Sequence, residues 1–182
     1  MTRDRSGELV FTPAVRAEQA RLGSREAYAR FEEKRGFGQE VSEELAAFIA
    51  DRESFYLGTA SADGQPYIQH RGGPKGFLKV IGPSTLGFAD FGGNRQYISI
   101  GNLTENPRAF VFLIDYEHAT RFKLWGHAEF VEGDAALLES LTDPEYGEVP
   151  ERAIVFHIEA WDKNCRKHIP TLVASSEPEP DR

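Results

Sequence analysis

The sequence predicts a single domain of 182 residues built as an antiparallel β-barrel with peripheral helices. At least six β-type runs follow one another between residues 54 and 161, and turn signals separate several of them. Helical patterns are confined to the two ends and one insertion, which argues against βαβ repeats. Thirteen Phe, six Tyr and two Trp supply large apolar side chains for one core.

The segment 1–53 is expected to form N-terminal helices. Residues 13–35 alternate charged residues and Ala with few apolar positions, which predicts one or two mostly exposed helices. Ser42 is followed by two glutamates, and a hydroxyl cap with acids in the first turn marks a helix start. An apolar i, i+3, i+4 stripe then predicts a short helix that ends near Arg52.

The barrel is expected over residues 54–173, and its strands are predicted as hairpins. Asp63-Gly64 is a tight-turn signal. The expected strands are 54–61 with 66–71, 77–81 with 85–90, 108–115 with 120–131, and a last strand at 151–161 after a helix at 134–141. Residues 95–105 have β-branched side chains but end at Asn106-Pro107, and we expect a short helix there. The Pro- and Glu-rich tail 174–182 is expected to be disordered.

Charge and cysteine content limit the function classes. The net charge of −8 argues against nucleic-acid binding. Residues 65–125 nevertheless hold seven Lys/Arg and four acids, a local excess that fits a small anion such as a phosphate. The sole cysteine, Cys165, excludes an internal disulfide, and no apolar run is long enough to cross a bilayer. We therefore expect a cytoplasmic protein with no membrane partner and no metal site.

Two basic glycine-rich loops are the strongest candidates for a binding site. The first, HRGGPKGFLKV, covers residues 70–80. The second, DFGGNRQ, covers residues 90–96 and precedes the expected short helix. Glycines let a ligand approach the backbone, and amide donors with a guanidinium at a helix start suit a phosphate. Taken singly, each loop is more often an ordinary hairpin loop with solvated basic residues than a binding site, since neither contains a P-loop or GxGxxG motif.

Together, the residues of segment 55–130 resemble flavoproteins of the pyridoxamine 5′-phosphate oxidase-like group. The resemblance lies in FYLGTASADGQPYIQHRGG, GFLKV, TLGFADFGGNRQYISIGNLTENPR and TRFKLWGHAEFV, taken in that order. It implies a six-stranded antiparallel FMN-binding split barrel, and a homodimer with FMN at the subunit interface. It also implies an FMN-dependent oxidoreductase that acts on a small molecule.

The resemblance also assigns cofactor-binding residues. Lys79 and Arg95 take the place of FMN phosphate ligands, and Arg121 that of a residue reaching the flavin from the other subunit. Asp90 stands where the family usually has a hydroxyl, and Gln96 where it often has a lysine. His70 and Arg71 resemble a bacterial branch with an HRGGP loop and a C-terminal Asn-Cys-x-x-His-Ile element. The full predicted set is His70, Arg71, Lys79, Ala89, Asp90, Asn94, Arg95, Gln96 and Arg121.

The C-terminal element leaves three interpretations open. Cys165 and His168 could act as nucleophile and base, or as half of a metal site, or the segment could be a structural turn beside the flavin pocket. No catalytic residue is assigned, because the isoalloxazine itself would perform the redox chemistry. Two other functions are compatible with the same barrel: a non-catalytic flavin- or haem-binding module, and a deazaflavin-dependent reductase.

Overall fold

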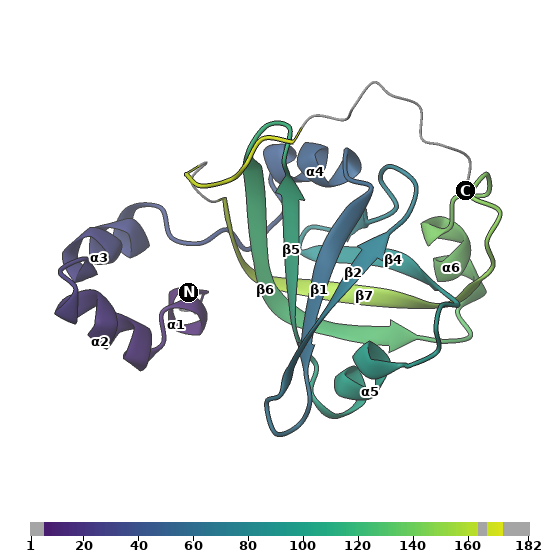
Figure 1. Cartoon of the computed structure of the whole chain (residues 1–182), viewed down its shortest axis with the longest axis horizontal. Helices are drawn as coiled ribbons and strands as arrows, with labels where there is room; N and C mark the ends of the chain where they lie inside the picture. Colours follow the sequence, from purple (N-terminus) through teal and green to yellow (C-terminus); the bar gives the residue numbers. More distant parts are fainter. Residues whose placement is uncertain (1–5, 164–166, 173–182) are drawn as a thin grey trace.

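The computed structural model describes residues 6–163 and 167–172, and its centre is one antiparallel sheet (Figure 1). The strand order is β2-β1-β5-β6-β7-β4-β3. The strands are β1 Ser54–Ala60, β2 Pro66–Gly72, β3 Lys79–Gly82, β4 Thr85–Phe91, β5 Arg108–Asp115, β6 Thr120–Val131 and β7 Pro150–Lys163. The predicted hairpins are therefore confirmed, while the tail predicted at 174–182 lies outside the described residues.

The six-stranded barrel that the family resemblance implies is wrong, because the sheet has seven strands and is open. All seven lie in runs that the sequence analysis expected as strands, and the shortest is β3, a four-residue edge strand that pairs with β4. At the other edge, β2 pairs with β1. No pairing between β2 and β3 occurs in the described residues, so the sheet curves without closing into a complete ring. Non-local pairs join the hairpins, since β5 lies beside β1 and β7 lies between β6 and β4.

The core lies on the concave side of this sheet. Alternation along β1, β5 and β6 sends every second side chain inward, with Leu57, Leu113 and Phe122 all fully buried. Helix α4, Glu43–Ala50, lies across one end of the sheet and buries Leu45. The predicted cap is confirmed, because the Ser42 hydroxyl accepts a hydrogen bond from the Leu45 amide at 3.2 Å.

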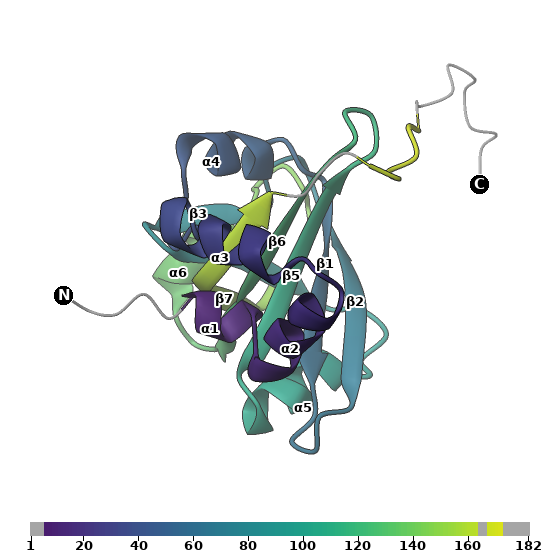
Figure 2. The same ribbon diagram turned by 90° about the vertical axis from the view of Figure 1, so that its left-hand side faces the viewer.

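The N-terminal helices form an arm on the outer side of the sheet (Figure 2). They are α1 Ser6–Val10, α2 Pro13–Arg21 and α3 Arg25–Lys34. One or two helices were predicted over 13–35 and two are found, while the short α1 was not predicted individually. Phe37 joins the arm to β6 through edge-to-face contacts, with its ring centroid 5.9 Å from that of Trp125 and 5.1 Å from that of Phe11.

Two further helices lie at the sheet ends, α5 Ile98–Glu105 and α6 Ala135–Leu141. The helix predicted within 95–105 is confirmed, but it begins at Ile98 rather than at Arg95. Arg95 and Tyr97 have φ angles of 57° and 52°, and this left-handed backbone prevents an earlier start. No helix among the described residues is long and apolar enough to span a membrane.

Gly126 marks the closest backbone approach between β6 and β7. The pairing register of these strands shifts between Trp125 and Gly126, which is the signature of a β-bulge. A Cβ atom on Gly126 would lie 1.9 Å from the carbonyl oxygen of His157. Only glycine fits this contact without a backbone shift.

Candidate functional site

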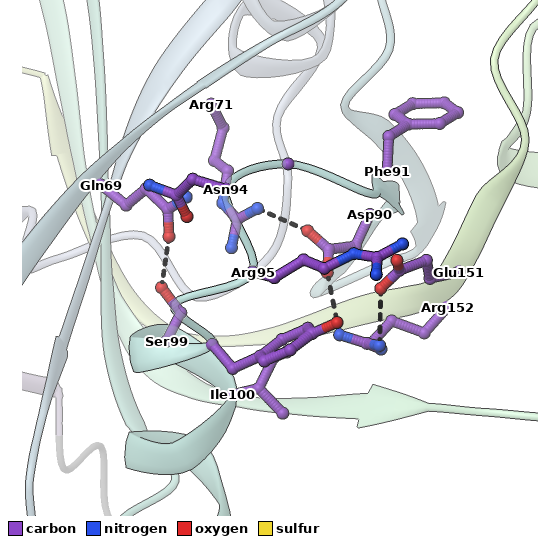
Figure 3. A pocket seen from close by; sticks show the side chains of 12 residues that line it. Gln69, Arg71, Asp90, Phe91, Asn94, Arg95, Ser99, Ile100, Glu151 and Arg152 are labelled. Carbon is purple, nitrogen blue, oxygen red and sulfur yellow. Dashed lines mark hydrogen bonds and ion pairs between the residues drawn. The ribbon is translucent and has the colours of Figure 1, made fainter.

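A polar cavity of about 210 Å³ lies where β2, β4, β7 and the first turn of α5 meet (Figure 3). We call it the β4–α5 pocket. Its lining residues are Gln69, Arg71, Asp90, Phe91, Gly93, Asn94, Arg95, Tyr97, Ser99, Ile100, Glu151 and Arg152. Both glycine-rich loops of the sequence border it, the first through the end of β2 and the second through residues 92–97.

A buried cluster of three charges forms the inner wall of the pocket. Asp90 pairs through Oδ1 with Arg71, and its Oδ2 lies 3.5 Å from Nη1 of Arg152. The side chains of these residues are 8%, 14% and 11% exposed, respectively. Their positions follow from the sheet, because Asp90 is opposite Arg152 in the β4–β7 register. Nε of Arg71 is buried and has no hydrogen-bond partner within the described part of the chain.

The rim of the pocket is polar, with Ser99 buried and Asn94 and Arg95 exposed. Ser99 donates a hydrogen bond to Oε1 of Gln69 at 2.8 Å, which links the start of α5 to β2. The side-chain oxygen of Asn94 accepts from the Gln96 amide at 3.2 Å and fixes the turn between them. Arg95 is exposed, and no ion pair or hydrogen bond to another described residue holds its guanidinium. The rim therefore offers a free cation beside the buried cluster.

The structure brings four of the nine predicted residues together in this pocket: Arg71, Asp90, Asn94 and Arg95. Gln96 is adjacent but does not line the cavity. Lys79 points elsewhere, because its Nζ donates to the Ser140 carbonyl at 3.0 Å and it lines a separate cavity with Lys75 and Thr142.

The remaining three predicted residues also lie outside the pocket. Ala89 is buried in a small apolar cluster with Leu141, since it alternates with Asp90 along β4. His70 alternates with Arg71 along β2, and its ring centroid lies 5.5 Å from that of Tyr56. Arg121 lies on the outer face of β6.

Five polar lining side chains were absent from the predicted set: Gln69, Tyr97, Ser99, Glu151 and Arg152. Gln69 was accessible to prediction, because it lies two residues before Arg71 and strand alternation places both on one face. Arg152 carried no such signal. Only the pairing of β4 with β7 brings it to the pocket, and that pairing spans 62 positions of the chain.

A second charged group lies at the other end of the sheet. A cavity of about 410 Å³ between α4 and the β5–β6 turn is lined by Asp51, Arg52, Asp115 and His118, among others. Burial raises the pKa of Asp115, but hydrogen bonds from His118 and the charge of Arg52 outweigh it and leave the pKa below its usual value. Arg52 and His118 lie 3.1 and 3.0 Å from Oδ2 of Asp115.

On the outer face of the sheet, Lys123 and Asp162 form a cross-strand pair with 3.9 Å between Nζ and Oδ2. Burial lowers the pKa of Lys123, and burial raises the pKa of Asp162. The pair is thus partly buried and close to Arg121, whose charge further lowers the pKa of Lys123.

The C-terminal element is described only in part. His168 is exposed with a φ angle of 63°, and Ile169 is buried. Cys165, on which the nucleophile and metal interpretations depend, lies outside the described residues. Within the described ranges, no group of three or more His, Cys, Asp or Glu side chains is arranged to hold a metal ion.

Comparison with known proteins identifies a family over most of the chain. The family model for pyridoxamine 5′-phosphate oxidase matches residues 41–165. No curated protein matches the sequence.

Solved structures share the fold at low sequence identity. HupZ from Group A Streptococcus matches with a TM-score of 0.55 at 18% identity, covering 68% of this chain and 93% of HupZ. A putative pyridoxamine 5′-phosphate oxidase from Lactobacillus delbrueckii matches with a TM-score of 0.54 at 21% identity, covering 69% and 95%. An FMN-binding protein from Syntrophomonas wolfei matches with a TM-score of 0.53 at 17% identity, covering 81% and 95%.

Proposed function

The chain belongs to the pyridoxamine 5′-phosphate oxidase family, and from this premise we propose that it binds FMN in the β4–α5 pocket and acts as an FMN-dependent oxidoreductase on a small molecule. One observation carries the proposal. Arg71, Asn94 and Arg95, drawn from both basic loops, converge on a single polar cavity. That convergence could not be assumed from the sequence, where the two loops are separated by β3 and β4.

The residues of the pocket fit a phosphate-bearing ligand. Within the described residues, the guanidinium of Arg95 has no partner, and Nε of Arg71 is a buried donor without one. Such an orphaned donor is costly in a folded protein and often indicates a missing partner. A guanidinium can bind two phosphate oxygens at once, and exposed amide groups of the glycine-containing loop add donors. Arg95, Asn94 and this loop would hold the phosphate, and Gln69 and Ser99 would face the polar part of the ligand.

The cavity of this chain alone is too small for the whole cofactor. Small-molecule sites usually measure about 300–1,000 Å³, whereas the β4–α5 pocket measures about 210 Å³. The phosphate and its neighbouring atoms can be enclosed, but a tricyclic ring extends beyond the lining residues. A second subunit that covers the ring would complete the site, and we include a homodimer in the proposal for this reason.

An apolar patch on the outer face of the sheet fits such a partner. Ile68 on β2 is 69% exposed, and Tyr56 and Phe112 lie beside it on β1 and β5 with ring centroids 6.4 Å apart. Exposed apolar patches of this kind are typical of association surfaces. His70 and Arg121 are on the same face by strand register. In a dimer through this face, both would approach the partner's flavin rather than their own.

When bound, FMN supplies the acceptor for a hydride or electrons from a reduced substrate. The chain's own residues bind and orient the cofactor and exclude water from it. A cation such as Arg121 near the pyrimidine edge of the flavin would favour the negatively charged reduced form. No side chain is required as a nucleophile, which agrees with the absence of an assigned catalytic residue in the predicted set.

A reduction experiment tests the oxidoreductase proposal. Purified protein loaded with FMN is mixed with NADPH in the absence of oxygen, and the flavin absorbance is followed before and after air is admitted. We expect the absorbance to bleach and then recover, since an oxidoreductase must accept and release electrons. If neither NADPH nor a panel of other small reductants reduces the bound FMN, the protein is a non-catalytic flavin-binding module instead.

A further inference from the structure

Arg152 holds a central place in the β4–α5 pocket although it lies outside both glycine-rich loops. Its Nη2 lies 2.8 Å from Oε2 of Glu151, and its Nε lies 3.2 Å from Oε1 of Glu132. Its Nη1 faces Oδ2 of Asp90 at 3.5 Å. All three nitrogens of the guanidinium are therefore directed at carboxylates. The guanidinium keeps further N–H groups, but the three carboxylates around it already compensate its charge, so Arg152 is less suited than Arg95 to bind a phosphate.

Asp90 links Arg152 to the residue that faces the ligand. One oxygen of Asp90 pairs with Arg71 and the other faces Arg152, so a single buried carboxylate is shared by two guanidinium groups (Figure 3). If Arg152 lost its charge, this carboxylate would have one cation instead of two. Breaking a buried ion pair on one side leaves an uncompensated charge. That charge would draw Arg71 toward Asp90 and would repel a phosphate in the same cavity.

Arg152 also contacts the loop that carries Arg95. Its Cζ lies 5.4 Å from the ring centroid of Tyr97, within the range of a cation–π contact. Tyr97 is 47% exposed and has a left-handed backbone with a φ angle of 52°. The contact ties the strained segment 95–97 to the sheet.

We propose that Arg152 is a positioning residue of the pocket. Its charge compensates that of Asp90, so that Arg71 faces the ligand. Its contact with Tyr97 anchors the segment 95–97, which carries Arg95. This inference rests on the proposed FMN site. It predicts selectivity for the phosphate, because the flavin ring and ribityl chain do not depend on the charge balance around Asp90.

A double-mutant cycle tests the proposal. Apo-protein is titrated with FMN and with riboflavin, which lacks the phosphate, for the wild type, Arg152→Gln, Asp90→Asn and the double variant. We expect Arg152→Gln to weaken FMN binding about tenfold and riboflavin binding less than about threefold. Asp90→Asn should rescue it, so that the double variant binds FMN within about threefold of Asp90→Asn alone.

Two control variants accompany the cycle. Arg108→Gln removes an arginine that pairs with Glu159 on the outer face, where its side chain is 60% exposed, and it should leave both affinities unchanged. Tyr97→Leu changes an exposed residue and should cause a smaller loss, selective for FMN, that remains measurable if Arg152→Gln does not fold.

Each other result has a definite meaning. An Arg152→Gln loss that Asp90→Asn does not rescue would show direct contact with the phosphate. Equal losses for FMN and riboflavin would show a structural role. Unchanged FMN affinity in both Arg152→Gln and Tyr97→Leu would also overturn the inference. A wild-type chain that binds neither flavin would overturn the proposed function itself, and the inference with it.

Discussion

Arg95→Ala should weaken FMN binding far more than Arg108→Ala, although both residues are exposed arginines of the same segment. Arg95 lines the β4–α5 pocket and no other described residue pairs with its guanidinium, whereas Arg108 already pairs with Glu159 on the outer face of the sheet. A hydrogen bond to a charged group contributes about 1.5–3 kcal/mol, which corresponds to roughly 10- to 150-fold in affinity. Because Arg95 is at the exposed rim, we expect the lower end, about tenfold.

The backbone at position 95 provides an internal control. Its φ angle of 57° is strained for any residue with a Cβ atom, by about 1 kcal/mol relative to glycine. Arg95→Gly should therefore lose FMN affinity as much as Arg95→Ala while raising thermal stability slightly. This separates loss of the guanidinium from a change in the loop.

The assay is a fluorescence titration of apo-protein with FMN and with riboflavin, accompanied by thermal denaturation of each variant. Arg95→Ala should affect FMN at least about threefold more than riboflavin. Equal losses for the two ligands would refute the phosphate assignment, and Arg95 would then have a structural role in the loop.

Three further predictions concern stability and assembly. Gly126→Ala should destabilise the fold by more than about 3 kcal/mol, because the added Cβ would overlap the carbonyl of His157 on β7. Gly101→Ala on α5 should not destabilise it, because the space around its Cβ is open. Thermal denaturation of both variants checks this difference. Since the pKa of Asp115 is lowered on folding, its contribution to stability is present above the unfolded pKa of about 3.9 and is lost as pH falls through the folded value. Asp115→Asn should therefore make the free energy of unfolding depend less on pH in the acid range. An unchanged pH dependence would contradict the lowered pKa of Asp115. Ile68→Lys should convert a dimer into a monomer by light scattering, and a dimeric variant would place the interface elsewhere.

Local patterns were sufficient to predict most of the secondary structure. Turn residues such as Gly64, which has a φ angle of 91°, determine where a hairpin folds back, and that information is contained in a few neighbouring residues. Likewise, the Ser42 cap and the Asn106-Pro107 stop mark helix ends through local hydrogen bonds and backbone restriction. The strand order and the open edge were not accessible in this way, because they depend on which hairpins pair with each other.

The candidate site was predictable in its loops but not in its inner wall. Arg71, Asn94 and Arg95 were identified because glycine and basic residues cluster near them in the sequence. Arg152 was missed because it reaches Asp90 only through the non-local β4–β7 register. Lys79 was assigned to the FMN phosphate from the family resemblance, but its side chain donates a hydrogen bond to a backbone carbonyl of α6. Its role in cofactor binding stays a prediction, as does the narrower bacterial branch suggested by the HRGGP loop.

The identity of the ligand released on heat denaturation tests the central claim most directly. Protein purified without added cofactor is denatured, and the supernatant is analysed by mass and by flavin fluorescence, with a second sample first incubated with FMN. The account predicts yellow protein that releases FMN rather than FAD, since the pocket offers its cations to one terminal phosphate. Release of haem or a deazaflavin, or a colourless protein that fails to bind added FMN, would contradict it.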